Sequence, residues 1–212
     1  PRVRLPSPSP AAALAFLIVP LATLLGGCIS HDVKFEDVKY AVPSMGEAKT
    51  TGTAVVAVIS TETLEQKVRI KSWMSGIGNN WETEPGLILR DVADIEFPQV
   101  FGSYVLSSSY AEPTTGERRV TVVLTIPSYD FAEFKASVSV HAAVYGPNKV
   151  ELLQKTYSAV GPTQGAKMFW GGAFAMKSAL RQSSLAAYKT IFEELRADLQ
   201  KVLASEKMTL PR

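Results

Sequence analysis

The sequence predicts an α+β fold in which two helices cover one face of an antiparallel sheet of about four to five strands. Short β-branched runs separated by Gly, Pro and Asn turns indicate the strands. A shorter segment that begins with proline and a long C-terminal segment both repeat apolar residues at three- and four-residue steps, which indicates amphipathic helices. Each helix must bury its apolar stripe, so we expect both to pack on the sheet.

The first predicted elements are a buried strand and the shorter helix. Residues 53–60 read Thr-Ala-Val-Val-Ala-Val-Ile-Ser, a short apolar run typical of a central strand. A second short strand is expected within residues 68–73, and residues 75–80 have the Gly and Asn content of a loop. The helix is predicted from Pro85 to Phe97, with Pro98 ending or kinking it.

Four consecutive runs then predict an antiparallel meander, at residues 102–110, 118–126, 134–145 and 149–160. Apolar and polar residues alternate through the third run, which places one face in the core and one in water. A glycine-rich link is expected from Gly161 to Gly172. The long helix is predicted from Phe174 to Ala204, about 46 Å at 1.5 Å per residue, enough to cross the whole sheet.

The segment before this domain has the features of an export signal. Arg2 and Arg4 precede the apolar residues 11–25, and this run is shorter than the roughly 20 residues of a membrane span. It ends in Leu25-Gly26-Gly27-Cys28, which contains the only cysteine of the chain. This tetrapeptide resembles the lipobox of bacterial lipoproteins. The alternative interpretation is an ordinary signal peptide followed by an incidental free cysteine.

The lipobox resemblance implies that a diacylglyceryl group is attached to the sulfur of Cys28. A signal peptidase would cut between Gly27 and Cys28, and the new N-terminus would be acylated with a chain such as palmitate. Cysteine suits this chemistry because its thiolate is a good nucleophile. Ile29 follows Cys28, whereas the familiar inner-membrane retention signal has Asp there, so the resemblance implies the inner leaflet of the outer membrane, with the domain in the periplasm.

These features predict a simple domain organisation. Residues 1–27 are the signal peptide, residues 28–50 the lipidated N-terminus and a tether, residues 51–205 a single α+β periplasmic domain, and residues 206–212 a tail. An edge strand within residues 33–42 is an alternative to a continuous tether. The first residue is Pro rather than Met, so we expect the natural start to lie further upstream.

Composition limits the classes of partner. The chain has 22 basic and 20 acidic residues, and residues 1–27 contain two Arg and no acid, so the mature chain has 20 of each and a net charge of zero. This balance argues against a nucleic-acid binder and against a polybasic membrane patch. With Cys28 acylated, no disulfide can form within the chain, and stability must come from the core.

No recognisable catalytic or metal-binding set stands out. His141 and Ser139 share a predicted strand face, but no third orienting residue and no Gly-x-Ser-x-Gly elbow accompany them. Asp91, Asp94 and Glu96 lie together on the first helix, where a solvated acidic face explains them better than a metal site. We therefore expect a non-enzymatic protein without a metal or cofactor other than the covalent lipid.

The segment Met168-Phe169-Trp170-Gly171-Gly172-Ala173-Phe174 has four large apolar residues and no regular period. The favoured interpretation is that Met168, Phe169, Trp170 and Phe174 close the end of the core where the long helix begins. The other interpretation is a contact loop for a partner, because Trp often dominates interface energetics. Such a loop beside a tethered domain could also dip into the membrane.

The C-terminal region carries a second, pattern-level resemblance. It lies in residues 155–161 (Lys-Thr-Tyr-Ser-Ala-Val-Gly), 179–187 (Ala-Leu-Arg-Gln-Ser-Ser-Leu-Ala-Ala) and 192–199 (Phe-Glu-Glu-Leu-Arg-Ala-Asp-Leu). With the lipobox, this resembles the auxiliary lipoproteins of ABC-type lipid transporters. The resemblance implies an accessory subunit of an envelope transport or assembly complex. The alternatives are a binding module for a small apolar or lipidic ligand, and an enzyme with an unrecognised site.

Overall fold

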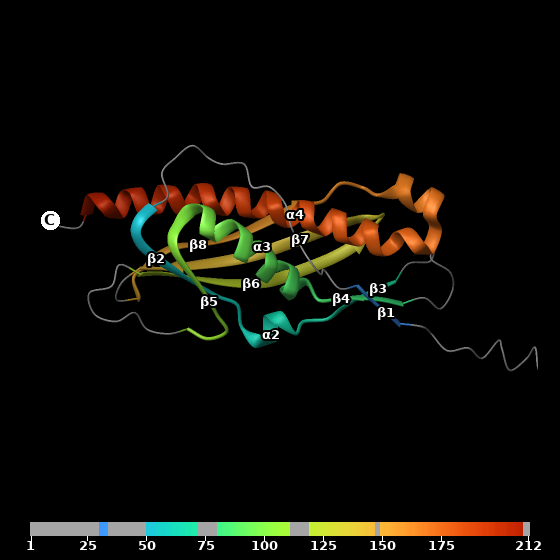
Figure 1. The fold of residues 1–212 in the computed structure, drawn as a ribbon, viewed down its shortest axis with the longest axis horizontal. Helices are drawn as coiled ribbons and strands as arrows, with labels where there is room; N and C mark the ends of the chain where they lie inside the picture. The colour runs from blue at the N-terminus through green and yellow to red at the C-terminus, as the bar shows by residue number, and fades with distance from the viewer. Residues whose placement is uncertain (1–29, 34–49, 72–79, 111–118, 147–148, 210–212) are drawn as a thin grey trace, which may run out of the picture.

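The predicted α+β fold class is confirmed by a computed structural model of the chain, which describes residues 30–33, 50–71, 80–110, 119–146 and 149–209 (Figure 1). A mid-chain helix and a long C-terminal helix pack on a sheet. The elements in chain order are β1 (Ser30–Val33), β2 (Thr50–Val58), α2 (Thr61–Leu64), β3 (Val68–Lys71), β4 (Asn80–Thr83), α3 (Pro85–Val100), β5 (Phe101–Ser107), β6 (Arg119–Ala132), β7 (Lys135–Tyr145), β8 (Glu151–Val160) and α4 (Gly165–Thr209).

The larger sheet has the strand order β5-β2-β6-β7-β8 and is mixed. β6, β7 and β8 form the predicted antiparallel meander. β2 instead lies parallel to both of its neighbours, β5 and β6, so the sheet is not antiparallel throughout. The reason is the long crossover between β2 and β5, which includes α3, since parallel neighbours require such a connection.

β6 continues well beyond its predicted end at Ile126. The pairing register between β6 and β7 shifts between Thr125 and Ser128, and Pro127 lies within this shift. Proline has no N–H to donate to a ladder, and it is tolerated where the pairing is already interrupted. The strand therefore resumes after Pro127 and pairs with β7 as far as Ala132.

A second, smaller sheet has the order β1-β4-β3, with β1 parallel and β3 antiparallel to β4. β3 was expected as a strand, while the edge strand considered as an alternative within residues 33–42 shares only Val33 with β1. β1 occupies part of the range assigned to the tether, while residues 34–49 lie outside the described residues. Val33, Ile70 and Trp81 are buried in the common hydrophobic core, so this sheet belongs to the domain.

Both helices are longer than predicted. α3 passes through Pro98 and ends at Val100, because this proline lies in the last turn and the N–H of Phe101 still donates to the carbonyl of Phe97. α4 begins at Gly165 rather than Phe174, which replaces most of the expected link. Gly171 and Gly172 weaken a helix by roughly 1 kcal/mol each relative to Ala but do not end it. α4 bends near its N-terminal end (Figure 1), as helices often do at glycine pairs.

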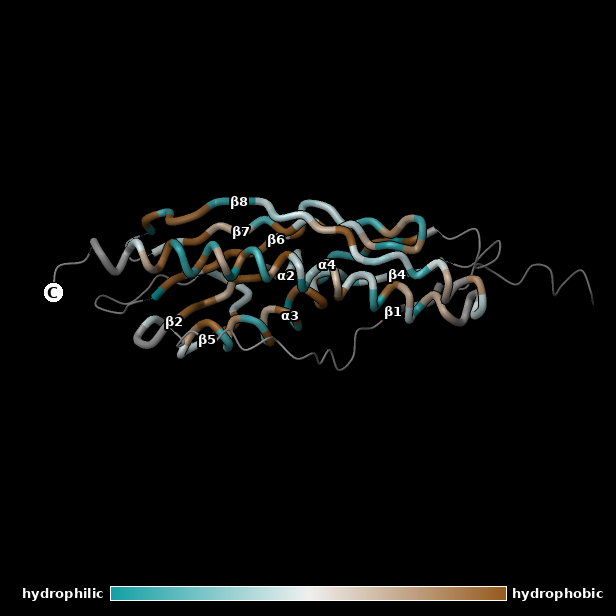
Figure 2. The backbone as a smooth tube through the Cα atoms, turned by 90° about the horizontal axis from the view of Figure 1, so that it is seen from above, coloured by the Kyte–Doolittle hydropathy of each residue, from teal (hydrophilic) through white to brown (hydrophobic). Residues whose placement is uncertain are grey.

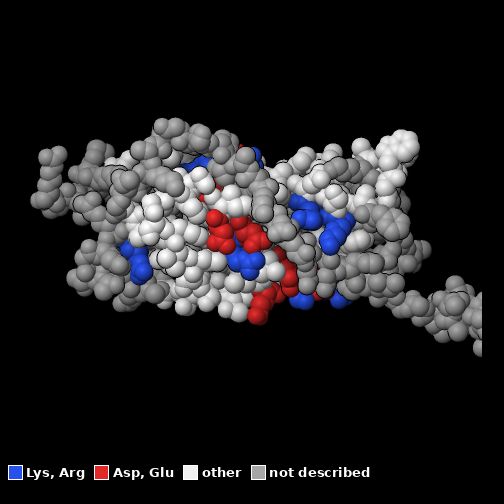
Figure 3. All heavy atoms as spheres, in the orientation of Figure 1, with Lys and Arg blue, Asp and Glu red and all other residues white. Residues whose placement is uncertain are grey.

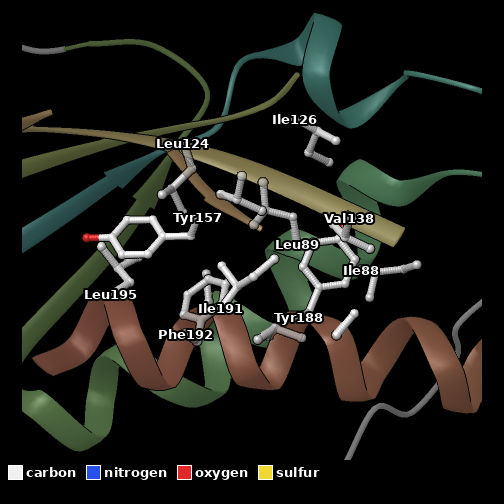
Figure 4. Close-up of a cluster of buried hydrophobic side chains, with 14 of the residues drawn as sticks. Ile88, Leu89, Leu124, Ile126, Val138, Tyr157, Tyr188, Ile191, Phe192 and Leu195 are labelled. Carbon is white, nitrogen blue, oxygen red and sulfur yellow. The ribbon is translucent and has the colours of Figure 1, made fainter. Parts of the chain in front are cut away.

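The core lies between the helices and one face of the larger sheet, as predicted. The alternation along β7 is confirmed, because the side chains of Ala136 and every second residue as far as Val144 are buried. Figure 2 shows the hydrophobic stretches concentrated in the strands and in the helical segments that lie against them. In Figure 4, apolar side chains from α3, α4 and the strands fill the space between the layers. The predicted inner face of α4 is buried at Met176, Leu180, Ala187, Ile191, Leu195 and Leu199, while its last member, Val202, is only partly buried.

Two serines fix where α4 crosses the β6–β7 hairpin. Ser183 and Ser184 are fully buried, the Oγ of Ser183 accepts from the N–H of Ala136 at 2.8 Å, and the Oγ of Ser184 is 2.7 Å from the hydroxyl of Tyr129. Gly161 touches the same point, since a Cβ added there would lie 1.9 Å from the carbonyl oxygen of Ser183. Only glycine therefore allows the chain to leave β8 so close to the helix.

Within the described residues, no helix combines the length and the apolar character needed to cross a membrane, although α4 has 45 residues.

Candidate functional site

The most exposed large hydrophobic side chains in the described part of the chain are Phe169 and Trp170, near the start of α4. Phe169 is 75% exposed and Trp170 is 86% exposed. Their rings form an edge-to-face pair with centroids 5.2 Å apart. Aromatic side chains that close a core are buried. Both rings are largely exposed, so the interpretation that these two residues close the end of the core is wrong. The side chains of Met168 and Phe174 lie outside the described ones.

The link between β8 and α4 positions this aromatic pair. Gln164 donates its backbone N–H to the carbonyl of Phe134 at 2.8 Å, and the hydroxyl of Thr163 donates to the carbonyl of Glu133 at 3.2 Å. Glu133 and Phe134, with φ of 50° and 59°, form the tight turn between β6 and β7. α4 therefore starts at the tip of this hairpin, at one end of the elongated molecule (Figure 1).

The small sheet β1-β4-β3 lies at the same end of the molecule in both Figure 1 and Figure 2, opposite the C-terminal end of α4. Cys28, the predicted lipidation residue, lies outside the described residues but only two positions before Ser30, the first residue of β1. Ser30–Val33 is paired with β4, so this stretch is held by the domain rather than serving as a free tether.

Charge is distributed unevenly along α4. Residues 165–192 include four basic residues (Lys167, Lys177, Arg181 and Lys189) and no acidic one, while every acidic residue of the helix lies between Glu193 and Glu206. In the view of Figure 3, the central acidic cluster lies over α3 with basic atoms beside it, and further basic groups lie toward the end where α4 begins. The exposed aromatic pair therefore belongs to a basic half of the helix.

His141 lies on the outer face of β7, as predicted, but it does not form a nucleophile–base pair with Ser139. Its Nδ1 is 3.0 Å from the hydroxyl of Thr156, and its Nε2 is 3.4 Å from the Nε2 of Gln154. The hydroxyl of Ser139 is hydrogen-bonded to that of Ser158 at 2.8 Å. These side chains are neighbours across the β7–β8 ladder, so the contacts stabilise strand pairing.

The three acidic residues of α3 point to different partners. Asp91 accepts from Arg90 at 2.7 Å, and Asp94 accepts from the hydroxyl of Tyr104 at 2.8 Å. Glu96 is buried and pairs with Arg196 of α4 at 3.0 Å. The solvated acidic face expected from the sequence is therefore wrong for Glu96. Across the described ranges, no three His, Cys, Asp or Glu side chains converge as metal ligands would.

A second polar contact joins α4 to the sheet at Asp198. Its Oδ2 accepts from the ammonium of Lys155 at 2.7 Å and from the hydroxyl of Tyr157 at 3.1 Å. The hydrogen bond from Lys155 holds the pKa of Asp198 below its usual range. Burial, together with the neighbouring carboxylate of Asp198, raises the pKa of Tyr157. Both residues therefore serve to fix α4 on β8.

Sequence reasoning missed the buried pair of Glu96 and Arg196 and the pairing of β1 with β4. The charged pair could have been suspected, because Arg196 lies four residues after Phe192 and three before Leu199, on the apolar side of the helix. β1 carries no such signal, since its four residues, Ser-His-Asp-Val, have a single apolar side chain.

No family model matches the chain, and no curated protein matches its sequence. Its fold is distantly similar to protein XCC0632 from Xanthomonas campestris, of the family DUF330, with a TM-score of 0.43 and 12% identity over 80% of this chain and 99% of that one. The hypothetical protein CT253 from Chlamydia trachomatis has a TM-score of 0.38 and 14% identity, over 72% of this chain and 99% of that one. A putative lipoprotein from Caulobacter crescentus CB15 has a TM-score of 0.36 and 12% identity, over 76% of this chain and 94% of that one. These likenesses concern the arrangement of elements alone.

Proposed function

We propose that this protein is a lipid-anchored, periplasm-facing subunit of an envelope transport or assembly complex, and that it is an accessory component rather than an enzyme. Its lipid is attached to Cys28, in the inner leaflet of the outer membrane. The observation that carries the proposal is the sequence Leu25-Gly26-Gly27-Cys28 after an apolar run, followed at once by a strand that is paired into the domain.

The candidate contact of the domain with the rest of the envelope is the exposed pair Phe169 and Trp170. Exposed aromatic residues at the end of a stable domain are costly to leave in water, and such residues commonly mark contact surfaces. The face that contains His141 supports the accessory role, because its polar side chains bond across strands rather than around a reactive group.

The lipid anchor is tested by Cys28→Ala in the full chain. One acyl chain gives marginal membrane binding and two or more give stable binding, at about 0.8 kcal/mol per buried CH₂. The wild type should fractionate with membranes and show an acylated N-terminal peptide by mass spectrometry. The variant should be unprocessed or soluble. A Cys28→Ala protein that is correctly processed and still sediments with membranes would contradict the assignment.

The accessory role is tested by purifying the acylated wild type from membranes after chemical cross-linking. We expect a reproducible envelope protein in stoichiometric amount, identified by mass spectrometry and absent from the Cys28→Ala preparation. A preparation that contains only this chain and one equivalent of phospholipid would favour the binding-module alternative. That alternative has less support, because Tyr157, Tyr188 and Phe192, all fully buried, fill the layer between helices and sheet where an apolar ligand would lie (Figure 4).

A further inference from the structure

We propose that Phe169 and Trp170 insert into the interfacial region of the phospholipid bilayer that holds the Cys28 lipid. α4 then docks the domain on the membrane at a second point, beside the covalent anchor. This inference rests on the proposed lipidation of Cys28, and it names the partner of the exposed aromatic pair.

Chain geometry places the anchor close to this pair. Consecutive Cα atoms are about 3.8 Å apart, so Cys28 lies within about 8 Å of Ser30 whatever the conformation of Ile29. Ser30 is held in β1 by its pairing with Asn80 of β4. A lipid on Cys28 therefore brings the end of the domain that contains β1 to the surface of the bilayer.

The same end contains the start of α4. β1 and β4 are parallel, with Ser30 opposite Asn80 and Val33 opposite Thr83. Ser30 and Asn80 therefore lie at the same end of the small sheet. α4 begins at this same end of the molecule (Figures 1 and 2), and Trp170 lies near its first residue, Gly165. The anchor and the aromatic pair therefore lie at the same end of the molecule, within reach of one bilayer.

The chemistry of the pair fits a lipid interface. Trp and Phe place large rings at the headgroup level, and Trp is enriched there because its ring is apolar while its N–H can still find a polar partner. Edge-to-face contact keeps the two rings together, so they would enter as one unit. Helices that lie at interfaces combine such aromatic residues with Lys and Arg.

The charges of α4 favour the same orientation of the domain, with the start of the helix toward the membrane. Residues 165–192 of α4 carry four basic residues and no acid, so this half is attracted to an anionic leaflet. From Glu193 onward the helix carries four acidic residues together with Arg196, Lys201 and Lys207, so this C-terminal part has no basic excess to attract it to the leaflet. The mature chain has no net charge, so the attraction orients the molecule without a general basic excess.

The test uses the acylated, mature full chain in vesicles of phosphatidylcholine and phosphatidylglycerol, with or without bromine on the acyl chains. Bromine quenches tryptophan only at close range. The Trp170 signal is the emission of the wild type minus that of Trp170→Phe, which removes the contributions of Trp73 and Trp81. We expect brominated lipid to remove most of the Trp170 signal.

A matched control places a tryptophan on an exposed position away from the anchored end. Val105 of β5 is 53% exposed, and Val105→Trp is made in the Trp170→Phe background. Its added emission should be the same in brominated and unbrominated vesicles. Thermal melting checks that each variant is folded.

Two results would overturn the inference. In the first, Trp170 is quenched no more than the Val105→Trp control. In the second, Trp170 is unquenched on vesicles while Trp170→Ala loses a cross-linked protein partner, which would make the pair a protein-binding surface.

Mass spectrometry of the Cys28 peptide separates these results from a failure of the proposed function. An unmodified Cys28 would refute the anchor, whereas an acylated Cys28 with unquenched Trp170 would refute only the insertion.

Discussion

The two halves of α4 put similar residues to opposite uses. From Ala179 to Leu203 most apolar side chains are buried, and two charged residues, Arg196 and Asp198, are also held by partners on other elements. Near the start of the helix, Phe169 and Trp170 are exposed and contact each other. The difference lies in what faces the helix, because its C-terminal half covers β7 and β8 while its first turns begin beyond the β6–β7 hairpin.

This comparison shows that residue type alone does not decide burial. A stripe of Ile, Leu and Phe predicts a buried face only where an opposing layer exists. In the first turns of α4 the same kinds of residue remain available for contact with a membrane or a partner. Substitutions in the two halves should therefore differ in kind: those in the C-terminal half should change stability, and those in the first turns should change association.

The largest effect is expected for Arg196→Met. This substitution leaves the carboxylate of Glu96 buried without its guanidinium partner, and breaking a buried pair typically costs about 3–5 kcal/mol. Urea denaturation followed by circular dichroism would measure the free energy of unfolding. The control is Arg90→Met, which breaks the more exposed pair with Asp91 and should cost less than about 1 kcal/mol. If both variants lost the same free energy of unfolding, the pair of Glu96 and Arg196 would not be buried.

Ile191→Ala should destabilise the domain by about 2–5 kcal/mol, because the Ile191 side chain is fully buried between α4 and the sheet. Lys189→Ala, two residues earlier and partly exposed, should change the free energy of unfolding by no more than about 0.5 kcal/mol. Differential scanning calorimetry of both variants gives the comparison. Similar shifts in melting temperature would show that the wrong residues have been assigned to the inner face of α4.

Asp198→Asn should have a smaller, pH-dependent effect. The pKa of Asp198 is lowered in the folded protein, so its contribution is present above the unfolded value of about 3.9 and is lost as the pH decreases through the folded pKa. We expect a loss of about 1 kcal/mol at pH 7, modest because Lys155 is well exposed. Unfolding curves of the two proteins should converge in strong acid. A constant difference at every pH would exclude the ionised carboxylate as the cause.

Trp170→Ala should produce the smallest change in stability, within about 0.5 kcal/mol, because the Trp170 side chain is 86% exposed. Thermal melting of the full-length variant checks this. A loss of several degrees would show that the ring packs on the domain and would restore the core interpretation.

The main layers could be predicted from the sequence because they depend on local periodicity. The alternation in β7 and the apolar stripe around Ile191 each required only neighbouring residues. The direction of β2 could not be predicted in this way, since its partners lie some 50 to 70 positions later in the chain. Nor could the exposure of Trp170, which depends on how the described elements are placed around the start of α4 rather than on any property of the segment itself.

The position of β2 has a consequence for how the chain acquires its structure. β2 is flanked on both sides by strands that come later, β5 and the first residues of β6. Its ladder cannot be completed until residue 123 is available, whereas β6, β7 and β8 need only their immediate successors. During this interval the apolar side chains of Val55, Val56, Val58 and Ile59 have no covering strand, and such segments are prone to aggregate. A chain that emerges from its N-terminus therefore needs this strand shielded until residue 123 has followed.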